Sequence, residues 1–172
     1  MNTLTSRMLR AAKLDVDLYE EVEADKQTMG QATAVVVLSS LAAGIGTVST
    51  GGVAGIVIAT LGSLLAWYIW AYMTYFIGTR FLAEPQTQAD LGELLRTIGF
   101  SSSPGLIRVL AILTPLRDVV LATASLWMLV AMVIAVRQAL DYTSTWRALA
   151  VCAIGWAIQA GLLVLLFALL AD

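Results

Sequence analysis

Long apolar stretches separated by short polar segments dominate the hydropathy pattern of this chain. Four of them, residues 31–50, 53–78, 118–136 and 148–171, have the length of a membrane-spanning helix. A helix of about 20 residues, rising about 1.5 Å per residue, crosses a hydrocarbon core of about 30 Å. A fifth run, residues 98–116, is interrupted by a charged residue and by proline. The pattern predicts an all-α fold, a polytopic membrane bundle of about five transmembrane helices.

The segment before the first run, residues 1–30, is polar and divides by charge. Arg7, Arg10 and Lys13 lie among apolar residues, so this part predicts a short amphipathic helix that rests on anionic lipid. An acidic stretch, Asp15–Asp25, follows directly. We expect its carboxylates to form a solvated helical face, and the alternative is that they bind a cation or a basic partner.

Two helix starts are predicted from capping residues. Asp17 with Glu20, and Asp90 with Glu93, have the spacing of a capping box, in which each of two residues bonds the backbone N–H of the other. The second pair opens a short surface helix within the polar loop of residues 80–103.

The distribution of positive charge predicts the orientation of the bundle. With five spans and a cytoplasmic N-terminus, the ten Lys and Arg residues divide nine to one in favour of the cytoplasmic side. If residues 98–116 re-enter the membrane without crossing it, the ten divide eight to two. The positive-inside rule therefore favours five spans, with residues 1–30 in the cytoplasm and residues 31–172 forming the transmembrane bundle.

Composition agrees with a membrane protein and narrows the possible chemistry. The chain is 59% hydrophobic and 13% charged, with a mean hydropathy of +0.84, which is more apolar than a soluble domain of 172 residues. Its net charge of −2 gives no reason to expect a nucleic-acid partner. The sequence has no histidine and one cysteine, Cys152, which excludes His-ligated haem or metal and an intrachain disulfide. We predict no catalytic, cofactor or metal residues, and no enzyme.

Small residues recur at every fourth position along the second apolar run. Gly51, Gly55, Ala59 and Ser63 form a stripe that lets helices approach closely in lipid. We expect this stripe to pack within the bundle, and an interface with a second copy or another protein is the alternative.

Three polar side chains, Arg108, Asp118 and Gln159, fall near membrane depth. Ionisable groups at that depth are costly and often functional. Arg108 can extend its side chain to the surface, Asp118 lies at a helix start, and Gln159 needs one hydrogen-bonding neighbour. We expect structural roles for all three, and a transport path is the alternative.

Two short motifs stand in a fixed order along the chain. Asp17-Leu18-Tyr19 lies in the N-terminal segment, and Gly99-Phe100-Ser101-Ser102-Ser103-Pro104 opens the third run. Together with the join MLVAMVIAVRQALDYTSTWRAL before the last run, they resemble the YIP1 family of small multi-span membrane proteins. That family carries D-L-Y and G-Y-x-x-x-P signatures. This chain has Phe100 for the second tyrosine, and Glu20 where eukaryotic members have Gly-Pro.

The resemblance implies five helices, a cytoplasmic N-terminus and a role without chemistry. Eukaryotic members are scaffolds that engage Rab GTPases and shape membranes, but the departure at Glu20 gives no basis for transferring the Rab partner. The short chain is more similar to prokaryotic members, which implies a prokaryotic inner, or cytoplasmic, membrane. The motifs supply the candidate interaction residues: Asp17, Leu18, Tyr19, Glu20, Gly99, Phe100 and Pro104.

Three functions stay open at this stage. The first is a membrane scaffold or membrane-organising protein that uses residues 1–30 and loop 80–103 as its interaction surface. The second is an accessory subunit of a larger respiratory or photosynthetic complex. The third is a small transporter or channel. The expected partners are the lipid bilayer and other membrane proteins or a second copy, and no cofactor is expected.

Overall fold

The computed structural model describes residues 3–47 and 52–170, and every regular element in these ranges is a helix. The predicted all-α membrane bundle is confirmed. In chain order, with η marking 3-10 helices, the elements are α1 (Leu4–Ala12), α2 (Val16–Ala24), η1 (Lys26–Thr28), α3 (Met29–Thr47), α4 (Gly52–Arg80), α5 (Leu91–Ser101), η2 (Ser103–Ile112), η3 (Thr114–Leu116), α6 (Arg117–Ala139) and α7 (Thr145–Leu170).

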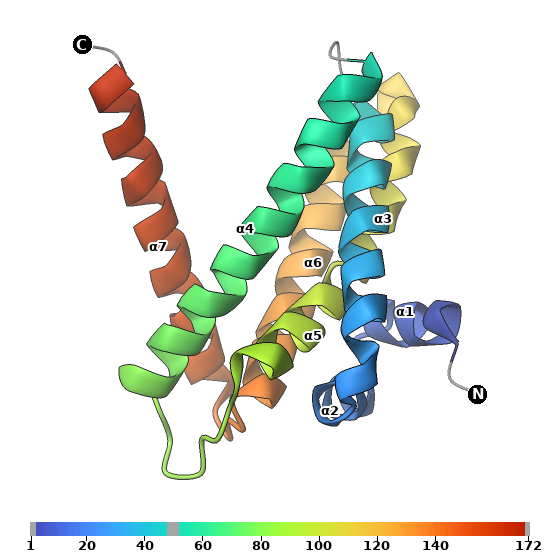
Figure 1. Cartoon of the computed structure of the whole chain (residues 1–172). Helices are drawn as coiled ribbons and strands as arrows, with labels where there is room; N and C mark the ends of the chain where they lie inside the picture. The colour runs from blue at the N-terminus through green and yellow to red at the C-terminus, as the bar shows by residue number, and fades with distance from the viewer. Residues whose placement is uncertain (1–2, 48–51, 171–172) are drawn as a thin grey trace.

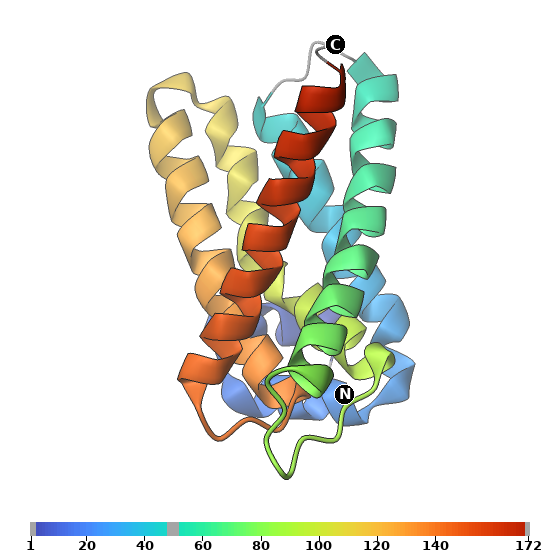
Figure 2. The same ribbon diagram turned by 90° about the vertical axis from the view of Figure 1, so that its left-hand side faces the viewer.

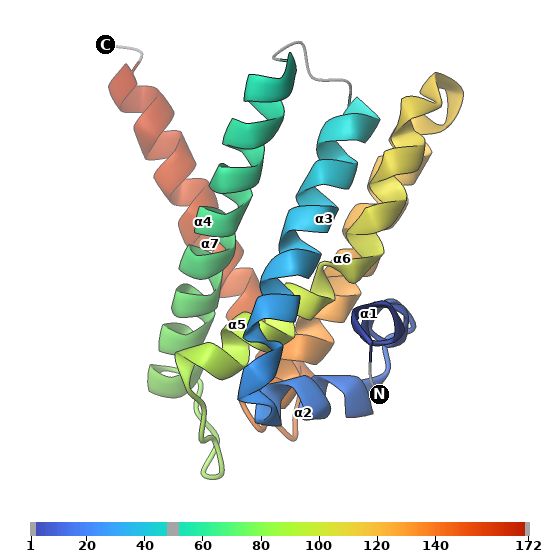
Figure 3. The ribbon, with the colours of Figure 1, turned by 45° about the vertical axis from the view of Figure 1, so that its right-hand side comes forward.

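The helices form an upright bundle with shorter helices packed across one end. α3, α4, α6 and α7 run along the long axis of the molecule, and α1, α2 and α5 lie across its lower part (Figures 1 and 2). The chain ascends in α3, descends in α4, ascends again through α5 and η2, descends in α6 and ascends in α7 (Figure 3). We call the lower assembly of α1, α2, α5 and the loops 81–90 and 140–144 the N-terminal cap.

The number of membrane-length helices differs from the prediction of about five. Among the described residues, three segments are long and apolar enough to cross a membrane: Lys26–Gly46, Ala54–Arg80 and Arg117–Ala139. α7 has 26 residues, and several side chains in its second half lie outside the described set. The count by this criterion is therefore three rather than five.

The predicted span of residues 98–116 is wrong as a single helix. α5 ends at Ser101, and the chain continues as the 3-10 helix η2. Pro104 explains the break, because proline has no N–H to extend a helix and disfavours helical backbone in the residue before it. At about 2 Å per residue, the ten residues of η2 rise about 20 Å, short of a hydrocarbon core of about 30 Å.

One of the two predicted capping boxes is present. Asp90 accepts from the backbone N–H of Glu93, and the Glu93 side chain accepts from the backbone N–H of Asp90, as predicted. The box assigned to Asp17 and Glu20 is wrong, because α2 is capped by Asp15, whose carboxylate accepts from the backbone N–H of Asp17 at 3.1 Å. A sharp turn between α1 and α2, with Leu14 at φ 62°, places Asp15 in that position.

Close helix contacts occur away from the predicted small-residue stripe. A Cβ atom on Gly99 would lie 2.8 Å from the Cβ of Ala32, so α5 and α3 approach closely here. A Cβ on Gly46 would overlap the backbone carbonyl of Arg108, so α3 and η2 also touch through their backbones. Glycine in these positions allows the short α5–η2 segment to lie against α3.

Candidate functional site

The buried residues of the two sequence motifs meet in the core of the N-terminal cap. Leu18 and Tyr19 on α2 and Phe100 on α5 are fully buried in one apolar cluster, which also includes Val22 and Val35. The Tyr19 hydroxyl donates to the carbonyl of Ala11 at 3.4 Å, and burial raises the pKa of this phenol above its usual range. These motif residues hold α2 against α5 and face away from solvent.

The other motif residues divide between core and surface. Pro104 is fully buried, and Gly99 is buried at the contact with α3. Asp17 and Glu20 are exposed, and Glu20 accepts a hydrogen bond from the Gln138 side chain at 2.8 Å. Of the seven candidate interaction residues, only these two have exposed side chains.

The basic and acidic halves of the N-terminal segment pair with each other. Arg7, which is only 8% exposed, lies 2.8 Å from Glu21 and 3.2 Å from Asp25. Arg10 bonds Asp15 at 2.6 Å and Glu21 at 2.5 Å. The hydrogen bond from Arg10 to Asp15 holds the pKa of the Asp15 carboxyl below its usual value. The predicted solvated acidic face is therefore wrong for the paired residues Asp15, Glu21 and Asp25, whereas Asp17 and Glu20 are exposed. Contact of the basic helix with lipid stays a prediction.

Arg96 joins α5 to the end of α2. Its buried side chain donates from Nε to the Val22 carbonyl at 2.8 Å and from Nη2 to the Glu23 carbonyl. The last carbonyls of a helix have no partner within the helix, and a guanidinium satisfies them while complementing the helix dipole. This contact fixes the backbone of Glu23 relative to α5.

Four carboxylates that are far apart in the sequence line one hollow on the cap. Glu20 and Glu23 come from α2, Glu93 from α5, and Asp141 from the turn after α6. The hollow has a volume of about 550 Å³, and we call it the acidic groove. The rest of its lining consists of Ala24, Arg137, Gln138, Tyr142 and Thr143.

The acidic groove carries a net negative charge, because the described residues that line it include four carboxylates and one cation, Arg137. None of its four carboxylates lies within 4.0 Å of a cationic side chain in the described part of the chain. Arg137 instead donates to the carbonyls of Tyr142 and Thr143. The pKa of Glu23 is raised to about 7, mainly by burial and then by the negative charges of Asp141, Glu93 and Glu20.

A second network holds the rim of the cap together. Glu84, in the loop after α4, accepts from the backbone N–H and hydroxyl of Thr143 at 2.9 and 2.7 Å and pairs with Arg147 at 3.2 Å. These hydrogen bonds, led by the one from the Thr143 N–H, lower the pKa of the Glu84 carboxyl. Tyr142 donates to the Gly78 carbonyl at 2.9 Å. The turn between α6 and α7 is thereby anchored beneath α4.

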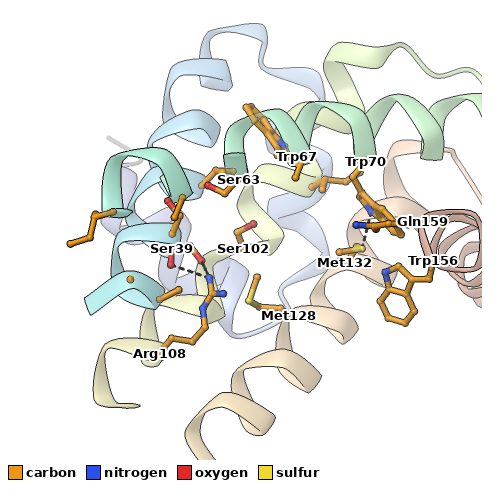
Figure 4. A pocket seen from close by; sticks show the side chains of 18 of the residues that line it. Ser39, Ser63, Trp67, Trp70, Ser102, Arg108, Met128, Met132, Trp156 and Gln159 are labelled. Atoms are coloured by element: carbon orange, nitrogen blue, oxygen red, sulfur yellow. Dashed lines mark hydrogen bonds between the residues drawn. The ribbon is translucent and has the colours of Figure 1, made fainter. Parts of the chain in front are cut away.

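Above the cap, a cavity of about 630 Å³ opens between the upright helices (Figure 4). Gly55, Ala59 and Ser63 line it, so this part of the predicted stripe faces a cavity; Gly51 lies outside the described residues. Arg108 and Gln159 line the same cavity, whereas Asp118 is exposed at the start of α6 and does not. Three tryptophans contribute to its walls: Trp67, Trp70 and Trp156.

Arg108 does not extend to the surface as predicted. Its Nη2 donates to the carbonyl of Ser39 at 2.9 Å and to the hydroxyl of Ser39 at 2.7 Å, and its Nε donates to the Gly105 carbonyl at 3.0 Å. The contact with Gly46 brings η2 against α3, and this places the guanidinium inside the bundle. The sequence shows that Arg108 lies near membrane depth, where a charge is costly. The direction of its side chain depends on the backbone contact between η2 and Gly46, which the sequence does not show.

The sequence gives no sign that Glu23, Glu93 and Asp141 share the acidic groove, or that Glu84 binds the turn between α6 and α7. These residues come from segments as many as 118 positions apart, and no local spacing connects them. Within the described ranges, no group of three or more His, Cys, Asp or Glu side chains has an arrangement that could hold a metal ion.

Comparison with known proteins identifies the family. The Yip1 domain model matches residues 18–167, which include Leu18 and Tyr19 of the first motif, the whole second motif and all the helices from α3 to α6. No curated protein and no solved structure matches the chain. Because the match covers most of the sequence, this chain belongs to the Yip1 family.

Proposed function

We propose that this Yip1-family membrane protein is a non-enzymatic scaffold that holds a basic segment of a partner protein in the acidic groove of its N-terminal cap. The observation that carries the proposal is the convergence of Glu20, Glu23, Glu93 and Asp141 around one hollow. Like charges held close together destabilise a fold, and clusters with shifted pKa values are a feature of functional sites.

The rigidity of the groove supports a binding role. Arg96 ties α2 to α5, Gln138 bonds Glu20, and Gln88 donates its backbone N–H to Asp141 at 3.4 Å. A preorganised site loses little conformational entropy when a partner binds. Lysine or arginine side chains entering the groove would relieve the mutual repulsion of the carboxylates, which gives the site both affinity and a preference for basic partners.

The predicted topology supports a cytoplasmic location for this surface. The cap carries the N-terminal arginines and the loop that the positive-inside rule assigns to the cytoplasm. A soluble or peripheral protein would then reach the groove without entering the bilayer. A transport path through the bundle has weaker support, because Asp118 lies apart from the cavity that Arg108 and Gln159 line.

Affinity purification from native membranes in a mild detergent tests this proposal. We expect the wild-type chain to retain a basic partner and the variant Glu20→Gln/Asp141→Asn to lose at least about 90% of it, since neutral amides remove two charges with little change in shape. Asparagine also tolerates the positive φ of residue 141, which is 52°.

Asp17→Asn is the matched control, because Asp17 is exposed on the same helix but does not line the groove. Retention by the control and loss by the double variant support the scaffold. Equal retention by all three chains contradicts the role of the groove. Recovery of a fixed set of integral proteins that withstands both high salt and the charge changes would instead assign the chain to a larger complex as a subunit.

A further inference from the structure

The cavity above the cap combines apolar walls with one cation. Its lining comes from α3, α4, α5, η2, α6 and α7, and includes Val36, Ile56, Met128, Met132 and the three tryptophans. The polar side chains in the lining are serines, Gln159 and Arg108, with no carboxylate among the described residues that surround it. Its volume of about 630 Å³ lies in the usual range for a small-molecule site, about 300 to 1,000 Å³.

Arg108 brings a positive charge into this cavity without a counterion from the described part of the chain. Its three hydrogen bonds go to uncharged oxygens of Ser39 and Gly105, and no carboxylate lies within 4.0 Å of it there. These bonds use Nε and Nη2, and Nη1 has no acceptor among the described residues. Figure 4 shows the guanidinium between Ser39 and Met128, directed into the space that the cavity occupies.

The cavity can be reached from the side, between α4 and α7. These helices meet near Trp70 and Trp156, whose ring centroids are 6.2 Å apart, and they diverge above this contact (Figure 1). Ala59 and Ala66 on α4 and Gln159 on α7 line the cavity and are themselves exposed. In a membrane, the molecules that meet such an opening are lipids.

We propose that this cavity binds an anionic phospholipid, with the headgroup phosphate on Arg108 and an acyl chain between α4 and α7. A guanidinium binds phosphate through charge-assisted hydrogen bonds, and Nη1, which bonds none of the described residues, can supply donors for them. An uncompensated cation at this depth is costly, and a lipid phosphate neutralises it. A zwitterionic lipid fits less well, because no carboxylate in the described lining can pair its ammonium group.

Native mass spectrometry of the full chain in mild detergent tests this site. The probes are phosphatidylglycerol and phosphatidylethanolamine with the same acyl chains, and inorganic phosphate alone. We expect one phosphatidylglycerol per protein, bound about tenfold more tightly than phosphatidylethanolamine, and no retained inorganic phosphate. Arg108→Gln, which can still bond Ser39, should lose this preference about tenfold, whereas Arg117→Gln, at an exposed position outside the cavity, should keep it.

Ala59→Phe provides a second variant that leaves Arg108 and its partners unchanged. It places a ring in the cavity from an exposed position on α4, so we expect a folded protein that has lost the bound lipid. Equal lipid binding by the wild type and Arg108→Gln, no headgroup preference in the wild type, or unchanged binding by Ala59→Phe would overturn the proposal. A co-purified membrane protein that must be removed before lipid binds would also overturn it, by assigning the cavity to a partner helix. The site on Arg108 does not depend on the acidic groove, so each proposal can fail alone.

Discussion

Replacement of Tyr19 separates a structural role for the D-L-Y motif from a role in partner contact. Tyr19 is fully buried, and its neighbours Leu18, Val22 and Phe100 are fully buried too. Truncation to alanine removes the ring from a closed core, and such large-to-small changes cost about 3 to 5 kcal/mol. At about 2 to 4 °C per kcal/mol for a chain of this size, we expect Tyr19→Ala to lower the melting temperature by roughly 6 to 20 °C.

Tyr19→Phe is the control for this experiment, because it keeps the ring and removes only the hydroxyl. That hydroxyl makes one long hydrogen bond, 3.4 Å to Ala11, so we expect a loss of about 1 kcal/mol or less. Thermal unfolding followed by tryptophan fluorescence in detergent measures both variants. If Tyr19→Ala melts with the wild type but no longer retains a partner, Tyr19 is a contact residue and the buried-core reasoning is refuted.

Three further predictions concern the cap. Arg7→Ala should lower the free energy of unfolding by about 2 kcal/mol, because Glu21 and Asp25 lose a nearly buried partner. Lys13→Ala, at an exposed position, should change the free energy of unfolding little, and equal effects of the two substitutions would argue against a stabilising role of the Arg7 ion pairs. Gly99→Ala should destabilise the chain by about 1 to 3 kcal/mol through the Ala32 contact, whereas Gly30→Ala, with open space around it, should not; a stable Gly99→Ala variant would contradict the observed approach. Folding raises the pKa of the Glu23 carboxyl to about 7, so the folded chain holds that proton more tightly than the unfolded chain, and stability falls as the pH rises from about 4.5 to 7. Glu23→Gln should therefore be more stable than the wild type at pH 8, by about 1 kcal/mol in the free energy of unfolding after allowance for solvent screening, and equally stable at pH 4. Equal stability of the two chains at pH 8 would show that burial of the Glu23 carboxylate does not destabilise the fold.

The sequence predicts the upright helices and the family, because both depend on local features. Runs of about 20 apolar residues identify α3, α4 and α6, and the Asp90–Glu93 pair identifies the start of α5. Pro104 indicates that a helix is interrupted here. Whether the chain after it forms a short membrane helix or a 3-10 helix depends on its contacts with α3.

The sites could be predicted only in part, because long-range contacts assemble them. The motif containing Leu18 and Tyr19 contributes to the family resemblance, yet a three-residue pattern does not say whether its side chains face a core or a partner. Glu20 and Asp141 are neighbours only because α2 packs beside the end of α6. The sequence likewise does not determine the direction of the Arg108 side chain, because a long arginine side chain can extend either outward to the surface or inward to the bundle.

Photo-crosslinking in intact native membranes tests whether a basic partner is recruited to the acidic groove. A photoreactive amino acid replaces Gln138, which lines the groove, or Thr5, which is exposed on α1 outside it. We expect one dominant adduct from position 138, to a basic segment of a protein, that weakens at high salt and is absent from position 5. Equal adducts at the two positions, or an adduct at position 138 to an acidic or purely apolar segment that salt does not affect, would contradict this recruitment.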